Sequence, residues 1–245
     1  MKHLRWITVA LFCVFAWQVD DAGAAAYKVL KDGVANGGTL SGRITYDGTP
    51  PEPKTVVVDE DVDACGGKER KAEDLLVNGG GGIQNVVVSI EDVASGKQWN
   101  FGKEFTYDQK TCRFNPRIVL IEPGTPGAVL NNDSVGHNFH TISKGVYNIN
   151  KKIQPGTSLE VPKNKIRKSG LIRTKCDIHT WMGGYWVVAD NPYAALSDAD
   201  GKFSITEIPA GTYKVKIWHE TLGESMQEVV VKPGETTELN AALKM

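Results

Sequence analysis

One short segment of the chain combines three residue types that bind soft metal ions. Residues 176–184 read Cys-Asp-Ile-His-Thr-Trp-Met-Gly-Gly, so that Cys176, His179 and Met182 are each three positions apart. A thiolate and a thioether favour the cuprous ion, and an imidazole nitrogen accepts either oxidation state, so this set is suited to copper. Three extended residues span about 10 Å. The segment must therefore fold as a tight loop, which the glycine pair after Met182 would allow.

A second imidazole has to come from elsewhere in the chain. A site with two imidazoles, one thiolate and a weak axial thioether is one ligand short with this loop alone. The histidines available outside the loop and the N-terminal segment are His137, His140 and His219. Side chains three positions apart in an extended segment point to opposite faces, so only one of His137 and His140 can serve the same ion as Cys176. We interpret His219 as structural.

The first 26 residues have the pattern of a secretory signal peptide. Lys2 and Arg5 precede an apolar run over residues 6–17, and small residues follow at 22–26. A helix of that apolar length reaches about 18 Å, which is short of the roughly 30 Å hydrocarbon layer and disfavours an uncleaved anchor. We therefore expect residues 1–26 to be removed, and the mature protein to be periplasmic or secreted with no membrane span.

Export makes the cysteine count informative. Cys13 would leave with the signal peptide, and Cys65, Cys112 and Cys176 remain. In an oxidising compartment two cysteines are expected to pair, and the third needs protection, for example by a metal. Cys65 and Cys112 lie in polar, turn-rich surroundings, so we predict a Cys65–Cys112 disulfide and a metal-bound Cys176.

Composition and motifs argue against several classes of protein. The formal net charge is −1 and no cluster of Lys and Arg stands out, so we expect no nucleic-acid partner. The Cys-x-x-Cys-His motif of haem attachment does not occur in the sequence. A hydrolase is disfavoured because Cys176 and His179 share one short loop and no third orienting group is evident.

Short β-branched runs between Gly, Pro, Asn and Asp clusters predict an all-β protein. The expected strands are Thr39–Tyr46, Thr55–Asp59, Asn85–Ile90, Arg117–Ile121, Ala128–Asn131, Ser158–Val161, Gly170–Lys175, Tyr185–Val188, Phe203–Ile205, Thr212–Trp218, Gln227–Val231 and Thr237–Leu243. A short helix would fit only at Lys68–Leu76. We interpret Asp198-x-Asp200-Gly201 as a turn rather than a calcium site.

The segment from Phe105 to Asp190 resembles the cupredoxins. Its Cys176-x2-His179-x2-Met182 loop is similar in ligand spacing to the amicyanins. Upstream, Gly-His137-Asn resembles the azurin form of the first-ligand motif, whereas plastocyanins and amicyanins usually have Pro before that His. The resemblance implies one type 1 copper ion held by His137, Cys176, His179 and Met182.

The same resemblance implies further roles and a function. Asn138 would tie the two ligand segments together, and the Gly136 carbonyl would be a distant axial neighbour. Three strong ligands and one weak one leave no open position, so we expect a carrier of single electrons and not an enzyme. A c-type cytochrome or a periplasmic dehydrogenase would be its partner. In the family the second His is the electron exit near the surface, so we predict that His179 is the more exposed imidazole and the first ligand lost in acid.

A second resemblance lies at the two ends of the chain. Residues Leu196–Trp218 look like the carboxypeptidase regulatory-like, transthyretin-like sandwich, and Leu40–Tyr46 with Asn85–Val88 resembles its opening. The predicted fold class is all-β, with a cupredoxin Greek-key β-sandwich and a transthyretin-like β-sandwich.

The predicted division of the chain follows these two resemblances. We expect an N-terminal β part over 38–98, the cupredoxin-like domain over 105–190 and the carboxypeptidase regulatory-like part over 194–245. The two ends form one sandwich around the copper domain, or two sandwiches stand in tandem. The alternative function is a cell-envelope binding, assembly or copper-storage module.

Overall fold

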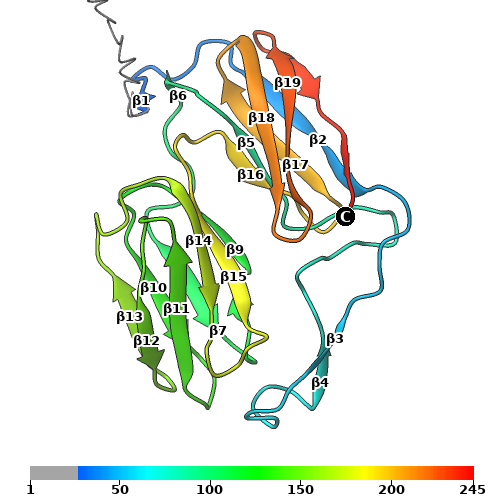
Figure 1. Cartoon of the computed structure of the whole chain (residues 1–245). Coiled ribbons are helices and arrows are strands. Elements are labelled where there is room, and N and C mark those ends of the chain that lie inside the picture. Colours follow the sequence, from blue (N-terminus) through cyan, green and yellow to red (C-terminus); the bar gives the residue numbers. More distant parts are fainter. Residues whose placement is uncertain (1–26) are drawn as a thin grey trace, which may run out of the picture.

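The computed structural model describes residues 27–245, and the predicted signal peptide over 1–26 lies outside the described residues. All regular elements in the described range are strands, β1 to β21. Most of them form two sandwiches, and β1 with β6 and β3 with β4 form two further two-stranded sheets (Figure 1). The predicted all-β fold class is confirmed. In the part of the chain that the structure describes, no helix is long and apolar enough to cross a membrane.

The central sandwich comprises residues 105–188. Its sheets have the orders β13-β10-β7-β8 and β12-β11-β14-β15-β9. Its strands are β7 (Phe105–Gln109), β8 (Phe114–Asn115), β9 (Ile118–Ile121), β10 (Gly127–Asn131), β11 (His137–Ser143), β12 (Asn150–Ile153), β13 (Ser158–Val161), β14 (Gly170–Lys175) and β15 (Gly183–Val188). Aromatic rings fill the space between the sheets, where Trp186 packs against Tyr107 and Phe139.

The terminal sandwich is built from both ends of the chain. Its sheets have the orders β16-β5-β18-β19 and β17-β2-β20, and β21 also pairs with β2. Its strands are β2 (Gly38–Tyr46), β5 (Val87–Ile90), β16 (Ala194–Leu196), β17 (Lys202–Ile208), β18 (Gly211–His219), β19 (Gly223–Val231), β20 (Thr236–Glu238) and β21 (Ala241–Leu243). Because β2 pairs with β17 and β5 with β18, the central sandwich is an insertion between strands of one sandwich. Beside the insertion point, β1 (Lys28–Val29) pairs with β6 (Ser95–Gly96).

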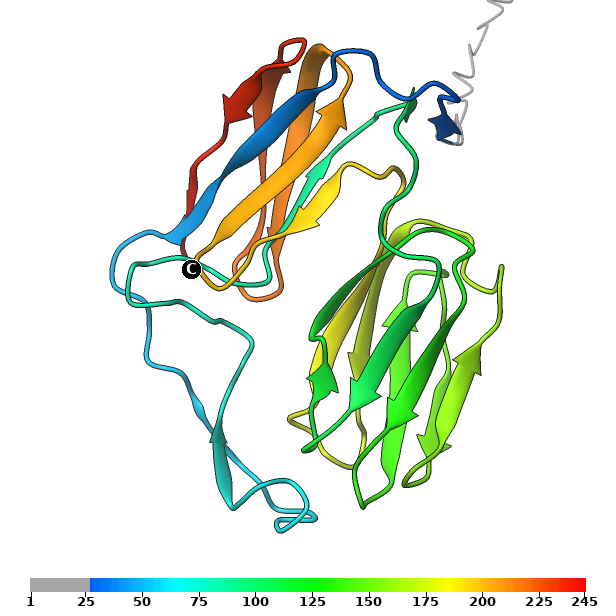
Figure 2. The ribbon, with the colours of Figure 1, turned by 180° about the vertical axis from the view of Figure 1, so that it is seen from behind.

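A long excursion, the arm (residues 47–82), joins β2 to β5. It leaves the terminal sandwich and extends past it, carrying the hairpin of β3 (Thr55–Val57) and β4 (Glu69–Lys71) (Figures 1 and 2). Val58 and Cys65 of the arm are buried in the core of the central sandwich. The arm thus starts in one sandwich and packs on the other, which the sequence did not indicate.

The helix expected at Lys68–Leu76 is wrong, because β4 occupies part of that segment. Tertiary contacts hold it extended. The Arg70 guanidinium donates hydrogen bonds to the carbonyls of Thr111 (2.9 Å) and Cys112 (2.8 Å) in the central sandwich. Such contacts override a weak local preference for helix.

Candidate metal centre

The sheet β12-β11-β14-β15-β9 brings the predicted ligands to one end of the central sandwich. His137 is the first residue of β11, and Cys176 directly follows β14. Since β11 pairs with β14 in antiparallel register, with His140 opposite Lys175, the start of β11 lies beside the end of β14. The segment 176–182 then forms the connection to β15. Strand pairing therefore places a residue 39 positions upstream next to the loop.

Three donor atoms converge at this point. The Nδ1 atoms of His137 and His179 lie 2.9 Å apart, and Cys176 Sγ lies 3.7 Å from His179 Nδ1. One donor atom from each of these residues lies within 4.8 Å of the others. All three side chains are buried. Two imidazole nitrogens and a sulfur in such a cluster form a donor set that suits copper.

The Cys176 sulfur accepts two backbone hydrogen bonds. Asn138 N–H donates to Sγ at 3.3 Å, and His179 N–H donates at 3.4 Å. Donors aimed at sulfur stabilise the negative charge of a thiolate, which is the form that binds a metal.

Asn138 makes hydrogen bonds to the ligand loop through both its backbone and its side chain. Besides its N–H bond to Cys176, its side-chain Oδ1 accepts a hydrogen bond from Asp177 N–H at 3.2 Å. Gly136, just before β11, packs beside Lys152, because a Cβ at this position would stand 3.1 Å from Lys152 Cε. Asn138 therefore ties β11 to the loop through backbone and side chain together.

Met182 closes the ligand loop. Its N–H donates to the His179 carbonyl at 2.9 Å, and its carbonyl accepts from Cys176 N–H at 3.3 Å. Its side chain is buried in the same core as Cys176. These bonds produce the tight turn that the spacing demands.

Of the glycine pair after Met182, Gly184 is required because there is no space for a side chain, not because of backbone freedom. Neither Gly183 nor Gly184 has a positive φ. A Cβ at Gly184 would lie 2.2 Å from the Tyr107 hydroxyl. That buried hydroxyl is 2.7 Å from Thr174 Oγ1, so a side chain at 184 would break a hydrogen bond directly behind the loop.

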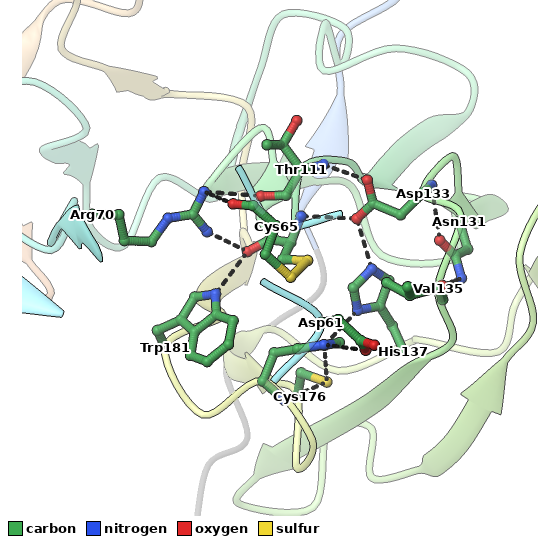
Figure 3. Close-up of a disulfide and its surroundings, with 12 residues drawn as sticks. Asp61, Cys65, Arg70, Thr111, Asn131, Asp133, Val135, His137, Cys176 and Trp181 are labelled. Atoms are coloured by element: carbon green, nitrogen blue, oxygen red, sulfur yellow. Dashed lines mark hydrogen bonds and ion pairs between the residues drawn. A yellow bond between two sulfur atoms is a disulfide. The ribbon is translucent and has the colours of Figure 1, made fainter. Parts of the chain in front are cut away.

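The outer nitrogen of each imidazole faces a carboxylate. His137 Nε2 lies 2.7 Å from Asp133 Oδ2, and His179 Nε2 lies 3.0 Å from Asp61 Oδ2. Asp61 belongs to the arm, and Figure 3 shows it close to His137 and Cys176. Carboxylate partners of this kind fix the ring orientation and the tautomer of metal-binding histidines. Burial lowers the pKa of His137, which favours the neutral imidazole that can bind a metal.

The prediction that His179 is the more exposed imidazole is wrong. The side chains of His179 and His137 are both 0% exposed. The arm contributes to this burial, because its Asp61 Oδ2 lies 3.0 Å from the outer nitrogen of His179. The predicted order of ligand loss in acid rested on exposure and has no support from it.

The disulfide predicted between Cys65 and Cys112 is confirmed, and it ties the arm to the central sandwich. Asp133 lies next to it, because its carboxylate accepts hydrogen bonds from the N–H groups of Thr111 and Cys112 (2.8 Å for Cys112) as well as contacting His137 (Figure 3). The disulfide and the candidate metal centre therefore share one hydrogen-bond network.

The other histidines lie away from the donor cluster. His140 points to the opposite side of β11, where its Nδ1 lies 3.0 Å from Asp177 Oδ2. His219 is buried in the terminal sandwich and accepts a hydrogen bond from Thr221 N–H at 3.2 Å. The turn interpretation of Asp198 agrees with its Oδ1, which accepts from the N–H groups of Asp200 and Lys202.

The sequence reasoning missed both carboxylates. Asp133 stands four positions before His137, so a check for acidic residues near the predicted ligand would have found it. Asp61 lies 118 positions from His179, and no local pattern connects the two.

Comparison with known proteins gives one family match. Residues 183–244 match the carboxypeptidase regulatory-like domain model, in agreement with the resemblance at the C-terminal end. The match begins at Gly183, the first residue of β15, so it covers the strand that directly follows the ligand loop. No curated protein sequence matches the chain.

Several solved structures are similar to parts of the chain. A Cu-containing nitrite reductase (NirK) from Thermus scotoductus SA-01 is 20% identical, with a TM-score of 0.32, over 40% of this chain and 24% of that chain. A purple cupredoxin from Nitrosopumilus maritimus is 26% identical, with a TM-score of 0.27, over 31% of this chain and 81% of that one. An oxidised amicyanin variant is 17% identical, with a TM-score of 0.31, over 35% and 82%. The similar part spans only about a quarter of the nitrite reductase.

Proposed function

We propose that the chain is an exported type 1 copper protein that shuttles single electrons between periplasmic redox partners. The observation that carries the proposal is the buried cluster of His137 Nδ1, His179 Nδ1 and Cys176 Sγ. His137, Cys176, His179 and Met182 would hold the ion. A copper ion bound there would supply one-electron chemistry by alternating between the cuprous and cupric states.

The protein residues would keep the donor set unchanged between these states. Asn138 holds the two ligand segments together, and the two carboxylates hold the imidazole rings. A donor set that is held in place changes little when an electron arrives or leaves, which suits a carrier. With these four ligands on the ion, no open coordination position would remain for a substrate. Electron transfer therefore fits the site better than catalysis.

Export is supported by two features. The sequence begins with a pattern typical of a signal peptide, and Cys65 and Cys112 form a disulfide, which persists in oxidising compartments. A c-type cytochrome or a periplasmic dehydrogenase would be a suitable redox partner.

Spectroscopy of the copper-loaded mature chain tests this proposal. We expect residues 27–245 loaded with cupric ion to show an intense visible thiolate-to-copper band and a type 1 electron paramagnetic resonance signal. Cys176→Ser should remove the band, and His140→Gln, on the other face of β11, should keep it. A colourless loaded protein, or a band that survives Cys176→Ser, would contradict the proposal.

A copper-storage or cell-envelope binding module is the second candidate. The observation in its favour is that both imidazoles are covered. It predicts a protein that stays colourless after cupric loading but retains cuprous ion or a partner protein. The same spectrum therefore separates the two candidates.

A further inference from the structure

The outer edge of His179 is closed to a redox partner. The arm lies over it, with Asp61 Oδ2 3.0 Å from Nε2. Val58 of the arm is buried in the core of the central sandwich, and Cys65 is bonded to Cys112. These contacts hold the arm in place. If the proposed function is correct, electrons must reach the site by another route.

Trp181 provides such a route. It lies in the ligand loop between His179 and Met182, and its ring centroid is 5.3 Å from that of the His179 imidazole. Its indole N–H donates to the Cys112 carbonyl at 3.2 Å, which fixes the ring beside the disulfide (Figure 3). Trp181 is half-buried, in contrast to the fully buried His179. One face of the ring thus meets a ligand while another part of it reaches the surface.

A cleft opens at this residue. Its volume is about 660 Å³, and residues of the arm, of the central sandwich and of the segment after β18 line it. Trp181, Cys176 and Met182 all belong to its wall. The cleft therefore reaches the ligand loop from the surface, and Asp61 is not among the residues that line it.

The cleft is positively charged. Seven Lys or Arg residues and four Asp or Glu residues line it, an excess of three positive charges in a chain whose formal net charge is −1. Three of the cations pair with acidic neighbours in the cleft, namely Arg113 with Glu73, Arg117 with Glu220 and Lys175 with Asp177. Lys54, Lys71 and Arg173 are exposed and have no ion-pair partner among residues 27–245.

We infer that this cleft is the docking site for a redox protein with an acidic face, and that Trp181 is the electron port. Trp181 would pass one electron from a bound cuprous ion to a one-electron acceptor docked in the cleft, so that the copper would be oxidised to the cupric state and the acceptor reduced. No proton or chemical group moves. Opposite charges at such a site attract the partner and raise the rate of encounter. The inference rests on the proposed function.

Charge reversal in the cleft tests the docking site. The copper-loaded, reduced mature chain is mixed in a stopped-flow instrument with hexacyanoferrate(III), an anion, or with tris(phenanthroline)cobalt(III), a cation. We expect Lys54→Glu with Arg173→Glu to slow oxidation by the anion about tenfold at low ionic strength and to accelerate oxidation by the cation. Both effects should shrink in high salt, where charges are screened.

The matched control reverses two cations at the other end of β14. Lys163→Glu with Lys165→Glu changes the net charge equally, at exposed positions in the segment before β14, away from the ligand loop. The control should leave both rates near those of the parent. Equal rates for the two double variants would overturn the inference.

Substitution of the indole tests the port itself. Trp181→Leu should lower the rate of oxidation by both oxidants severalfold while the thiolate-to-copper band is kept. Trp181→Phe should lower these rates less. If Trp181→Leu does not bind copper, the charge-reversal variants still test the docking site, because they alter no ligand. A loaded parent protein without the band would overturn the proposed function and this inference together. A normal band with unchanged rates in the variants would overturn this inference alone.

Discussion

The two imidazoles of the candidate copper centre have similar surroundings that come from different parts of the chain. The outer nitrogen of His137 faces Asp133, four residues away in the same sandwich. The outer nitrogen of His179 faces Asp61, 118 residues away on the arm of the other sandwich. One side of the site is therefore complete whenever the turn between β10 and β11 folds. The other side is complete only when the arm is docked.

This difference shows how an inserted domain can depend on its host. The central sandwich contains every predicted ligand, but the arm of the terminal sandwich decides which edge of the site partners can reach. The disulfide and Arg70 make this contact durable, since both connect the arm to the 111–112 turn. The following predictions separate the two sides, from the largest expected effect to the smallest.

Removal of the disulfide should loosen the contact between the arm and the central sandwich. Cys65→Ser with Cys112→Ser opens a loop with a sequence separation of 47. We expect it to lower the free energy of unfolding by about 4 kcal/mol, measured by urea titration. The thiol of Cys176 in the metal-free protein should also react faster with a thiol reagent, because Asp61 and its neighbours no longer cover the loop. An unchanged unfolding midpoint together with unchanged thiol protection would show that the arm docks without this bond.

His219 can be compared with the two candidate ligands, because it is a buried histidine that has no carboxylate partner among the described residues. Burial, with a smaller effect of Arg117, lowers the pKa of His219 to about 4, while Asp74 acts weakly in the opposite direction. The folded-state pKa lies below the unfolded value of about 6.5, so the unfolded state takes up the proton first. The stability that neutral His219 contributes is present above pH 6.5 and is lost as the pH falls toward 4.

The expected loss over this pH range is on the order of 3 kcal/mol. Urea titrations of the parent and of His219→Gln at several pH values between 7 and 4 measure it. The glutamine can still accept a hydrogen bond from Thr221 N–H, so the variant should keep the fold and lose this part of the acid dependence. Parallel pH profiles for the two proteins would contradict the prediction.

Asp133→Asn should weaken copper binding about 10- to 100-fold, as is usual when the partner of a metal-binding histidine is lost. Asp133 is mostly buried and also accepts hydrogen bonds from Thr111 and Cys112, so its loss disturbs the ring of His137 and the turn beside it. Competition with a chelator of known affinity measures the effect. A retained affinity would mean that β11 alone orients His137.

Asp61→Asn should have the smallest effect, less than about tenfold on copper affinity. Its carboxylate is 39% exposed, so solvent and salt screen its interaction with His179. Asp63→Asn, in the same exposed part of the arm, serves as the control. An effect of Asp61→Asn equal to that of Asp133→Asn would remove the distinction between the two sides.

Much of the strand pattern could be predicted from the sequence. Ser158–Val161 and Gly170–Lys175 form strands with the predicted bounds. β7, β11 and β12 were not expected. In β11 the buried positions include the polar residues His137 and Thr141, which obscures the alternation of apolar and polar side chains. In β11, for example, His137 and Phe139 are buried while Asn138 and His140 point outward. Only the packing of the second sheet shows which of these polar positions face the core.

For the site, the chain order of the candidate ligands and the cysteine pairing were accessible from residue types and spacing. The burial of His179 beneath the arm could not be predicted from residue types and spacing. A pair separated by 118 residues leaves no periodic signal, and Asp61 lies in a segment without a long strand or helix. The arm could not be assigned to the central sandwich because its contacts there depend on a few residues, such as Val58 and Cys65.

By itself, the sequence determined which donor atoms the chain can offer and that two cysteines would pair apart from the third. It did so because ligand chemistry depends on residue type and short loops depend on local spacing. Only the tertiary structure decided that both imidazoles are buried, that carboxylates face them and that Trp181 opens into a basic cleft. Those features arise where segments far apart in the chain pack together, and their positions follow from the whole fold.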